Sequence, residues 1–301
     1  MSNLHHVSYP ASQTAPTAKG LIEYATTDPV RSQPILSLHG GMGGYDQGIL
    51  LAKAAIDPDL ELTPLAISRP GYLNSPLASA KTPVEQADLF ASLLDHLQIE
   101  RAAVIAISAG GPSAIEFAAR HGERCSALIL VSCCAGHLPI RRAISMRLML
   151  MKILTRSARA TRWLQAKAKA DPRKTASRSI SDPDLLEQTI ANEKAWPMMQ
   201  ALQECVMDRM AKRLPGTIND TAQFNQPMAL PFAAIRCPTL IIHGEKDPVV
   251  PFAHASNAAR SIEKAKLVPL QDAEHVALFT HLQTVRNETG RFLAEAGICN
   301  K

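Results

Sequence analysis

The sequence has few aromatic residues, no long apolar run and no cysteine motif, and each absence excludes a class of protein. Aromatic residues make up 4% of the 301 residues, which argues against a base-stacking platform for single-stranded nucleic acid. No apolar run approaches the roughly 18 residues of a membrane span. Residues 1–20 lack the charged start and apolar stretch of a signal peptide. The six cysteines fit neither a zinc site nor a CxxC redox pair, so we expect reduced thiols in a cytoplasmic protein.

The net charge, composition and length of the chain are those of an ordinary globular protein. The net charge of +5 is modest for this length and does not by itself indicate a nucleic-acid partner. Hydrophobic residues make up 46% and charged residues 20%, which is enough apolar material for a sizeable core. A chain of 301 residues lies near the upper limit for one core, so we expect one large domain or a core with an insert.

Short apolar runs alternate with helical patterns along most of the chain. Thr82 and Glu85 form a capping box that opens a helix, and Gly122 ends a second helix that begins near Pro112. The predicted strands span residues 35–38, 62–67, 102–107, 127–131, 238–242 and 266–269. This alternation predicts a mostly parallel sheet with helices on both faces.

The segment from Gly136 to Pro231 breaks this alternation. Its patterns predict helices without intervening strands, and Asp-Pro, Pro-Gly and Gln-Pro steps separate them. The predicted helices span roughly residues 140–170, 184–193 and 196–214. We therefore expect a core formed by residues 1–135 and 232–301, with a helical cap over residues 136–231.

Ser108 lies between a predicted buried strand and a predicted helix. A serine in that context sits on a tight turn that pushes its hydroxyl above the sheet edge. The crowding there requires small residues two positions before and after the serine, and Ala106 and Gly110 satisfy it. Glycine is usual at both positions, so the motif is a variant. The context predicts Ser108 as a nucleophile rather than an ordinary turn serine.

The glycine-rich stretch His39 to Gly44 directly follows the first predicted strand. Such a loop can aim backbone N–H groups at a developing oxyanion. The hypothesis is that Gly41 donates one N–H and Ala109, just after the nucleophile, donates the other. A phosphate-binding loop is disfavoured because there is no GxxxxGKS/T and the GxGxxG spacing fails. The remaining alternative is a plain turn.

A general base and its acid partner follow two later strands. Asp247 and His275 each come just after a predicted strand, and the carboxyl ends of parallel strands meet at one sheet edge. His275 would accept the serine proton while Asp247 holds the imidazole. The chain order Ser, Asp, His supports this choice. The nearby competitors are His243, His254 and His281 for the base, and Glu245 and Asp272 for the acid.

Together these residues resemble the α/β-hydrolase superfamily over nearly the whole chain. The loop at residues 39–44 is similar to the oxyanion loop of prolyl-iminopeptidase-like and esterase-like members, where proline often stands at the Met42 position. Residues 68–72 and 244–247 look like the loop after the fourth strand and the acid loop. The resemblance implies an eight-stranded sheet, a helical cap after the sixth strand, and no cofactor or metal. The departures are Ala106 and Glu274, where glycine is common.

The expected activity is cofactor-free cleavage of an ester or related acyl bond in a small molecule. The fold also hosts aminopeptidases, acyltransferases and carbon–carbon bond hydrolases, so these stay open. An aminopeptidase would need acidic cap residues to hold the substrate amine, and Glu187, Glu193 and Glu204 are available. From another class, the alternative is a non-catalytic small-molecule-binding protein. The oligomeric state is left open.

Residues 141–178 are strongly basic, with twelve Lys or Arg and one acidic residue, Asp171. Apolar residues are interleaved with these charges. One hypothesis is an amphipathic surface that makes weak contact with an anionic membrane or attracts acidic, lipid-like substrates. The alternative is a solvated helix face whose apolar side closes the active-site pocket.

Overall fold

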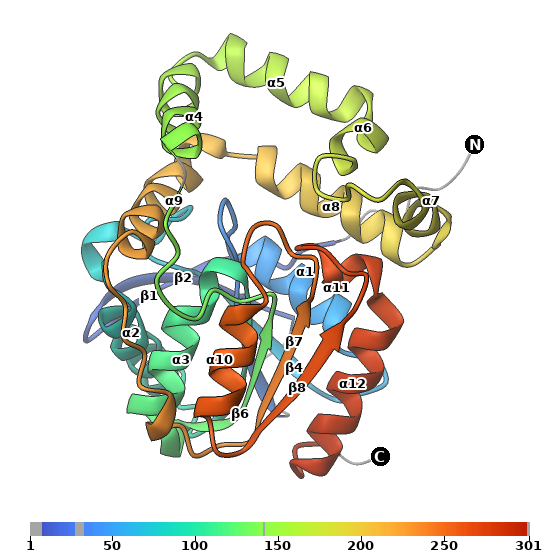
Figure 1. Ribbon diagram of the computed structural model, residues 1–301. Coiled ribbons are helices and arrows are strands. Elements are labelled where there is room, and N and C mark those ends of the chain that lie inside the picture. The colour runs from blue at the N-terminus through green and yellow to red at the C-terminus, as the bar shows by residue number, and fades with distance from the viewer. Residues whose placement is uncertain (1–7, 28–32, 141, 300–301) are drawn as a thin grey trace.

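A sheet of eight strands forms the centre of the molecule (Figure 1), and the computed structural model describes residues 8–27, 33–140 and 142–299. The strand order is β1-β2-β4-β3-β5-β6-β7-β8, and β2 alone runs opposite to the others. The strands are β1 (Gln13–Thr17), β2 (Gly20–Thr26), β3 (Pro34–Leu38), β4 (Thr63–Ser68), β5 (Ala102–Ile107), β6 (Cys125–Val131), β7 (Thr239–Gly244) and β8 (Ala265–Leu270). The expected fold class is therefore confirmed.

Helices cover both faces of the sheet because the strands send alternate side chains to either side. In β5, Val104 and Ala106 join one core cluster, whereas Ala103 and Ile105 join the other. The first face packs against α2 (Pro83–His96), α3 (Gly111–Arg120) and α10 (Ala253–Ser261). The second face packs against α1 (Tyr45–Ala55), α11 (Ala277–Thr280) and α12 (Leu282–Glu295). The central strands are thus buried on both faces, as their continuous apolar runs predict.

Between β6 and β7 the described residues form helices and no strand. These helices are α4 (Arg142–Leu154), α5 (Ala158–Ala170), α6 (Pro172–Ala176), α7 (Pro183–Ala191), α8 (Ala195–Met207) and α9 (Met210–Phe224). They lie together at one end of the sheet, as Figure 1 shows. We call residues 136–231 the helical insert. Within the described ranges, no helix is long and apolar enough to cross a membrane.

Two of the helices expected in the insert are each divided in the structure. The helix expected over residues 140–170 breaks before Ser157, whose side chain accepts a hydrogen bond from the N–H of Ala160 and caps α5. The helix expected over residues 196–214 breaks at Arg209, which has a φ of 46°. Periodicity alone did not reveal these breaks because apolar spacing continues across both of them.

The expected end of the last insert helix near residue 214 is wrong, because α9 continues through Pro215 to Phe224. A proline inside a helix prevents normal pairing of the backbone around it. Here Gly216 N–H donates to the carbonyl of Gly71 at 2.8 Å, and the carbonyl of Lys212 accepts from Leu73 N–H at 2.8 Å. The loop after β4 therefore satisfies both backbone groups and joins α9 to the core.

Candidate active site

Ser108 lies on the sharp turn between β5 and α3. Its φ is 52°, a left-handed conformation that costs energy for a residue other than glycine. A Cβ at Gly110 would lie 2.8 Å from the carbonyl oxygen of Leu38, so only glycine fits there. Ala106, by contrast, is fully buried and its methyl packs in the core. The turn thus tolerates alanine two positions before the serine but not two positions after it.

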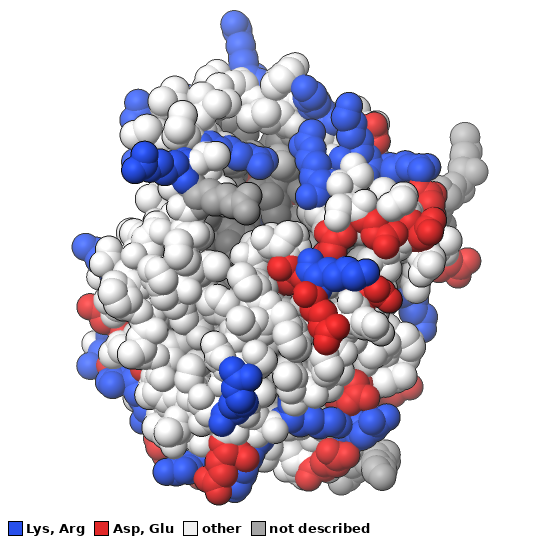
Figure 2. All heavy atoms as spheres, in the orientation of Figure 1, with Lys and Arg blue, Asp and Glu red and all other residues white. Residues whose placement is uncertain are grey.

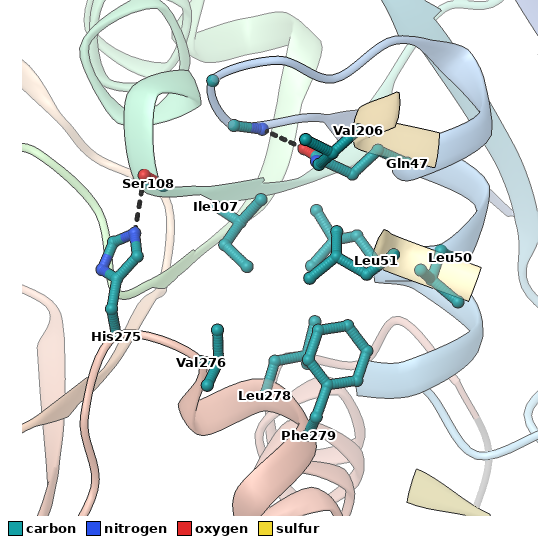
Figure 3. Close-up of a pocket in the computed structure, with 13 residues that line it drawn as sticks. Gln47, Leu50, Leu51, Ile107, Ser108, Val206, His275, Val276, Leu278 and Phe279 are labelled. Atoms are coloured by element: carbon teal, nitrogen blue, oxygen red, sulfur yellow. Dashed lines mark hydrogen bonds between the residues drawn. The ribbon is translucent and has the colours of Figure 1, made fainter. Parts of the chain in front are cut away.

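A chain of hydrogen bonds links Ser108, His275 and Asp247, which come from three separate loops. Ser108 Oγ lies 3.0 Å from His275 Nε2, the contact drawn as a dashed line in Figure 3. His275 Nδ1 lies 2.7 Å from Asp247 Oδ2. An ionised carboxylate only accepts, so Nδ1–H donates to Asp247 and Nε2 of the neutral ring can accept from Ser108 O–H. The geometry brings the three predicted side chains together.

Asp247 is buried and held by several donors. Its Oδ1 accepts from the backbone N–H groups of Val249 and Val250 at 2.8 and 2.9 Å. Burial raises the pKa of Asp247, but hydrogen bonds from His243 and His275 and from the Val250 N–H outweigh it and hold the pKa below the usual value. The carboxylate therefore stays ionised near neutral pH. His243, a sequence competitor for the base, lies beside Asp247 instead: its Nε2 is 2.9 Å from the Val250 carbonyl oxygen and 3.4 Å from Asp247 Oδ2.

The remaining competitors lie outside this hydrogen-bonded chain. His254 Nδ1 accepts from the backbone N–H of Ala135 at 3.1 Å, and burial lowers the pKa of His254. Asp272 forms an exposed ion pair with Lys246. No hydrogen bond to Ser108 or His275 is made by the side chains of His254, His281, Glu245 or Asp272, all of which are described.

Gly41 and Ala109 both line a cavity next to Ser108. Neither backbone N–H has an acceptor within the described part of the chain, so both are available to a ligand. Gly40 fixes the loop by donating its N–H to Gln47 Oε1 at 2.7 Å. A Cβ at Gly40 would come within 3.1 Å of the Ser108 Cβ, so this glycine permits the close approach of loop and nucleophile.

Met42 stands where similar loops often have proline, and its surroundings in the structure explain this difference. Its φ is 54°, and its N–H donates to Thr217 Oγ1 of α9 at 3.0 Å. Proline could adopt neither feature, because its ring fixes φ near −65° and it has no N–H. The methionine therefore accompanies a contact between this loop and the helical insert.

A buried ion pair stands behind the same loop. Arg69, just after β4, donates its backbone N–H to His39 Nε2 at 2.9 Å and its Nε–H to the His39 carbonyl at 3.0 Å. Its guanidinium binds both carboxylate oxygens of Asp220 on α9 at 2.7 and 3.0 Å. Tyr72 also donates to Asp220. Sequence analysis missed Asp220, because a single acid in a helical segment carries no signal of its partner 151 residues away.

Two apolar cavities meet at Ser108 and Gly41. The smaller, about 150 Å³, is lined mainly by α1, α8 and the His275–Phe279 segment, and Figure 3 shows its apolar side chains. That volume suits a group about the size of benzene. The larger, about 470 Å³, lies beneath α4 and α9 and is bordered by the 248–251 loop. Helices of the insert thus form part of both walls.

The described residues offer no alternative nucleophile or metal centre at this position. Cys134 lines the larger cavity, but burial raises the pKa of its thiol to about 12, so it is not a thiolate at neutral pH. No group of three or more His, Cys, Asp or Glu side chains in the described ranges is placed to hold a metal ion. All six cysteines are free.

Residues 33–282 match the alpha/beta hydrolase fold family. The chain belongs to that family. It is 30% identical over 271 residues to the uncharacterized hydrolase YcgS of Bacillus subtilis (strain 168), covering 85% of this chain and 89% of that protein. An alpha/beta hydrolase fold protein from Nakamurella multipartita superposes with a TM-score of 0.81 at 30% identity, covering 95% of this chain and all of that one.

Solved structures with lower identity show the same fold. A thermophilic esterase from Thermogutta terrifontis has a TM-score of 0.66 at 20% identity, covering 95% of this chain and 99% of that one. At that identity the likeness concerns the fold alone. The family and its hydrolase relatives support a hydrolase, whereas the reacting bond must be argued from the site.

Proposed function

We propose that the chain is a serine hydrolase that cleaves an ester or related acyl bond through an acyl-enzyme. The observation that supports this most directly is the hydrogen-bonded chain from Ser108 through His275 to Asp247. The nucleophile, base and orienting acid are within hydrogen-bond distance in the order that acyl transfer requires. The site needs no cofactor for this chemistry.

In the proposed mechanism Ser108 Oγ attacks the carbonyl carbon while His275 Nε2 takes its proton. Asp247 keeps Nδ1 protonated and stabilises the imidazolium that forms. The N–H groups of Gly41 and Ala109 stabilise the oxyanion of the tetrahedral intermediate. His275 then protonates the leaving alcohol, and a water molecule activated by His275 hydrolyses the acyl-enzyme.

The lining of the cavities favours an apolar ester over a peptide. An aminopeptidase needs a free carboxylate for the substrate amine, but none of Glu187, Glu193 and Glu204 lines a cavity at Ser108. Two of them, Glu187 and Glu204, also form ion pairs. Asp220 does line the larger cavity, but Arg69 neutralises it. We also propose that the helical insert is a cap, because α8 and α9 form part of the two cavity walls and so shape the substrate.

Replacing Ser108 by alanine tests the proposal. We expect Ser108→Ala to lower ester turnover by roughly three to six orders of magnitude, because the remaining groups supply only oxyanion stabilisation and binding. A fluorophosphonate probe should label the wild-type chain and fail to label this variant. A series of p-nitrophenyl esters of graded chain length, run beside amino-acid anilides, measures the preferred acyl group.

Ser113→Ala is a matched control, since Ser113 is a nearby buried serine whose side chain, among the described residues, hydrogen-bonds only to the Gly110 carbonyl. It should keep its activity and its labelling. An unlabelled wild-type chain that still binds apolar esters would instead indicate a non-catalytic binding protein. Anilide turnover that exceeds ester turnover would indicate an aminopeptidase.

A further inference from the structure

Helix α4 turns an apolar face toward solvent. Met146, Met149, Leu150 and Ile153 follow the i, i+3, i+4, i+7 spacing of a single helix face. These four residues are between 55% and 72% exposed. In Figure 1 α4 and α5 lie at the end of the molecule farthest from the sheet. A contiguous exposed apolar face of this kind marks an interaction surface rather than ordinary surface scatter.

The same region is strongly positive. The sequence from residue 141 to residue 178 has twelve Lys or Arg and one acidic residue, Asp171. Among its described cations, only Lys169 and Arg173 form ion pairs, with glutamates of α8 and α7. Figure 2 shows Lys and Arg side chains gathered at this end of the molecule. The positive charge is therefore left largely uncompensated.

Two cations of α4 lie on opposite sides of its apolar face. With 3.6 residues per turn, Arg147 and Lys152 lie about 110° to either side of its centre, and Arg147 borders the cavity that α4 and α5 line together. Arg142 lies about 30° from that centre, at the start of the helix. A helix that lies in the plane of a membrane interface has this arrangement, with apolar side chains inserted and long cationic side chains at the headgroups. On α5, Trp163 is 60% exposed at the cavity between α4 and α5, and Lys167 Nζ lies 5.0 Å from the centre of its ring. Tryptophan favours the same interfacial depth.

We propose that the exposed surface of α4 and α5, which we call the basic hairpin surface, docks on an anionic phospholipid bilayer. Anionic headgroups would neutralise the cations while the apolar face of α4 enters the boundary of the acyl chains. A second copy of this chain fits less well, because a two-fold contact would bring two identical sets of cations together. The proposal does not depend on the hydrolase activity.

Co-sedimentation of the full chain with vesicles tests the docking directly. We expect at least tenfold stronger partitioning onto phosphatidylcholine vesicles that contain phosphatidylglycerol than onto phosphatidylcholine alone, at low salt. Partitioning should weaken as salt rises, because the headgroup attraction is screened. The emission of Trp163 should shift to the blue on binding, and Trp163→Phe should remove that shift.

Two double variants separate the apolar and the charged contributions. Met149→Glu with Ile153→Glu removes the apolar face, and Arg147→Glu with Lys152→Glu reverses the flanking charge. Each should lower partitioning onto the anionic vesicles at least tenfold. All four side chains are exposed, so the fold should survive, which a melting curve checks.

Lys19→Glu and Leu21→Glu are the matched controls, since both side chains are exposed at the distant β1–β2 edge and the changes are of the same type. They should bind vesicles as the wild type does.

The proposal fails if the wild type does not bind anionic vesicles at low salt, if it binds neutral vesicles equally well, or if the controls lose as much binding as the hairpin variants. A wild-type dimer that dissociates in the Met149, Ile153 variant, without vesicle binding, would show that a second copy covers the face.

Discussion

At the residue scale, the nucleophile turn and the acid loop each depend on one residue that cannot be exchanged. Gly110 approaches the Leu38 and His39 carbonyls so closely that a Cβ has no room. Asp247 gathers backbone donors on one oxygen and two histidines on the other. The sequence motif identified both positions, but only the packed structure shows why the first must lack a side chain.

A paired substitution tests the asymmetry of the nucleophile turn. Gly110→Ala should lower the free energy of unfolding by about 1–3 kcal/mol and abolish most activity, because the added Cβ meets backbone oxygens at 2.8 and 2.9 Å. Ala106→Gly should cost about 1–2 kcal/mol and keep the activity, since it removes one buried methyl and adds flexibility to a strand without a clash. Denaturant unfolding and ester turnover measure both. Equal losses in the two variants would contradict the packing argument.

Asp247 predicts a defined pH dependence of stability. Its folded-state pKa is depressed from an ordinary value of 3.8, so its stabilising contribution is fully present above about pH 5 and is lost as the pH falls through the folded pKa. The difference in free energy of unfolding between the wild type and Asp247→Asn should therefore be largest near neutral pH and shrink below pH 4. Turnover of Asp247→Asn should fall about 10⁴-fold, because the amide favours the wrong imidazole tautomer. A stability difference that stays constant with pH would contradict this.

At the element scale, α9 joins the helical insert to the loops of the core. Its Pro215 frees backbone groups that the 71–73 loop satisfies, and its Thr217 accepts the Met42 N–H. Farther along the helix, Asp220 holds Arg69, which in turn holds the carbonyl of His39 behind the proposed oxyanion loop. Helical periodicity predicted a helix in this region, but not the contacts that fix it.

We expect Asp220 to act as a positioning residue for that loop. Asp220→Asn weakens the ion pair with Arg69. We expect kcat to fall roughly ten- to hundredfold, because the loop at residues 39–44 is then misplaced. The KM of a short-chain ester should change less. Steady-state kinetics separate the two parameters, and Asn219→Ala on the same helix is the control with an exposed partner. Unchanged kcat with lowered stability would mean that the pair is only structural.

A double variant of Arg69 and Asp220 separates the effect of the pair on loop position from the cost of burying an unpaired charge. Removing one partner of a buried pair costs about 3–5 kcal/mol, whereas replacing both by apolar residues often costs little. Arg69→Met with Asp220→Leu should therefore recover much of the stability that Asp220→Leu loses. Its kcat should stay low, since nothing then holds the His39 carbonyl.

At the scale of the whole molecule, the helical insert and the core meet close to the proposed base. Glu274, directly before His275, is buried and accepts hydrogen bonds from Ser181 N–H, Ser181 O–H and Asp182 N–H at 2.8, 2.7 and 3.2 Å. The departure from the common glycine at this position is therefore a contact between the insert and the base loop. It ties the segment before α7 to the loop that carries His275.

Glu274→Ala should release that contact. We expect a loss of about 2 kcal/mol in the free energy of unfolding, because three donors lose a charged acceptor. Amide exchange at residues 181–182 should accelerate. Glu274→Gln is the matched control, because its amide oxygen still accepts. Hydrogen-exchange mass spectrometry reads both variants, and protected amides at 181–182 in Glu274→Ala would show that the contact does not anchor the insert.

The sequence by itself determined the central strands, the covering helices α2 and α3, and the choice of Ser108, His275 and Asp247 as candidates. These follow from local patterns, since buried strands need apolar runs and the nucleophile turn needs small neighbours. Tertiary structure decided the antiparallel pair β1 and β2, the path of α9 through Pro215, the Arg69–Asp220 pair and the exposure of the apolar face of α4. Those features join segments far apart in the chain or depend on what packs beside them, and neither is encoded in a local pattern.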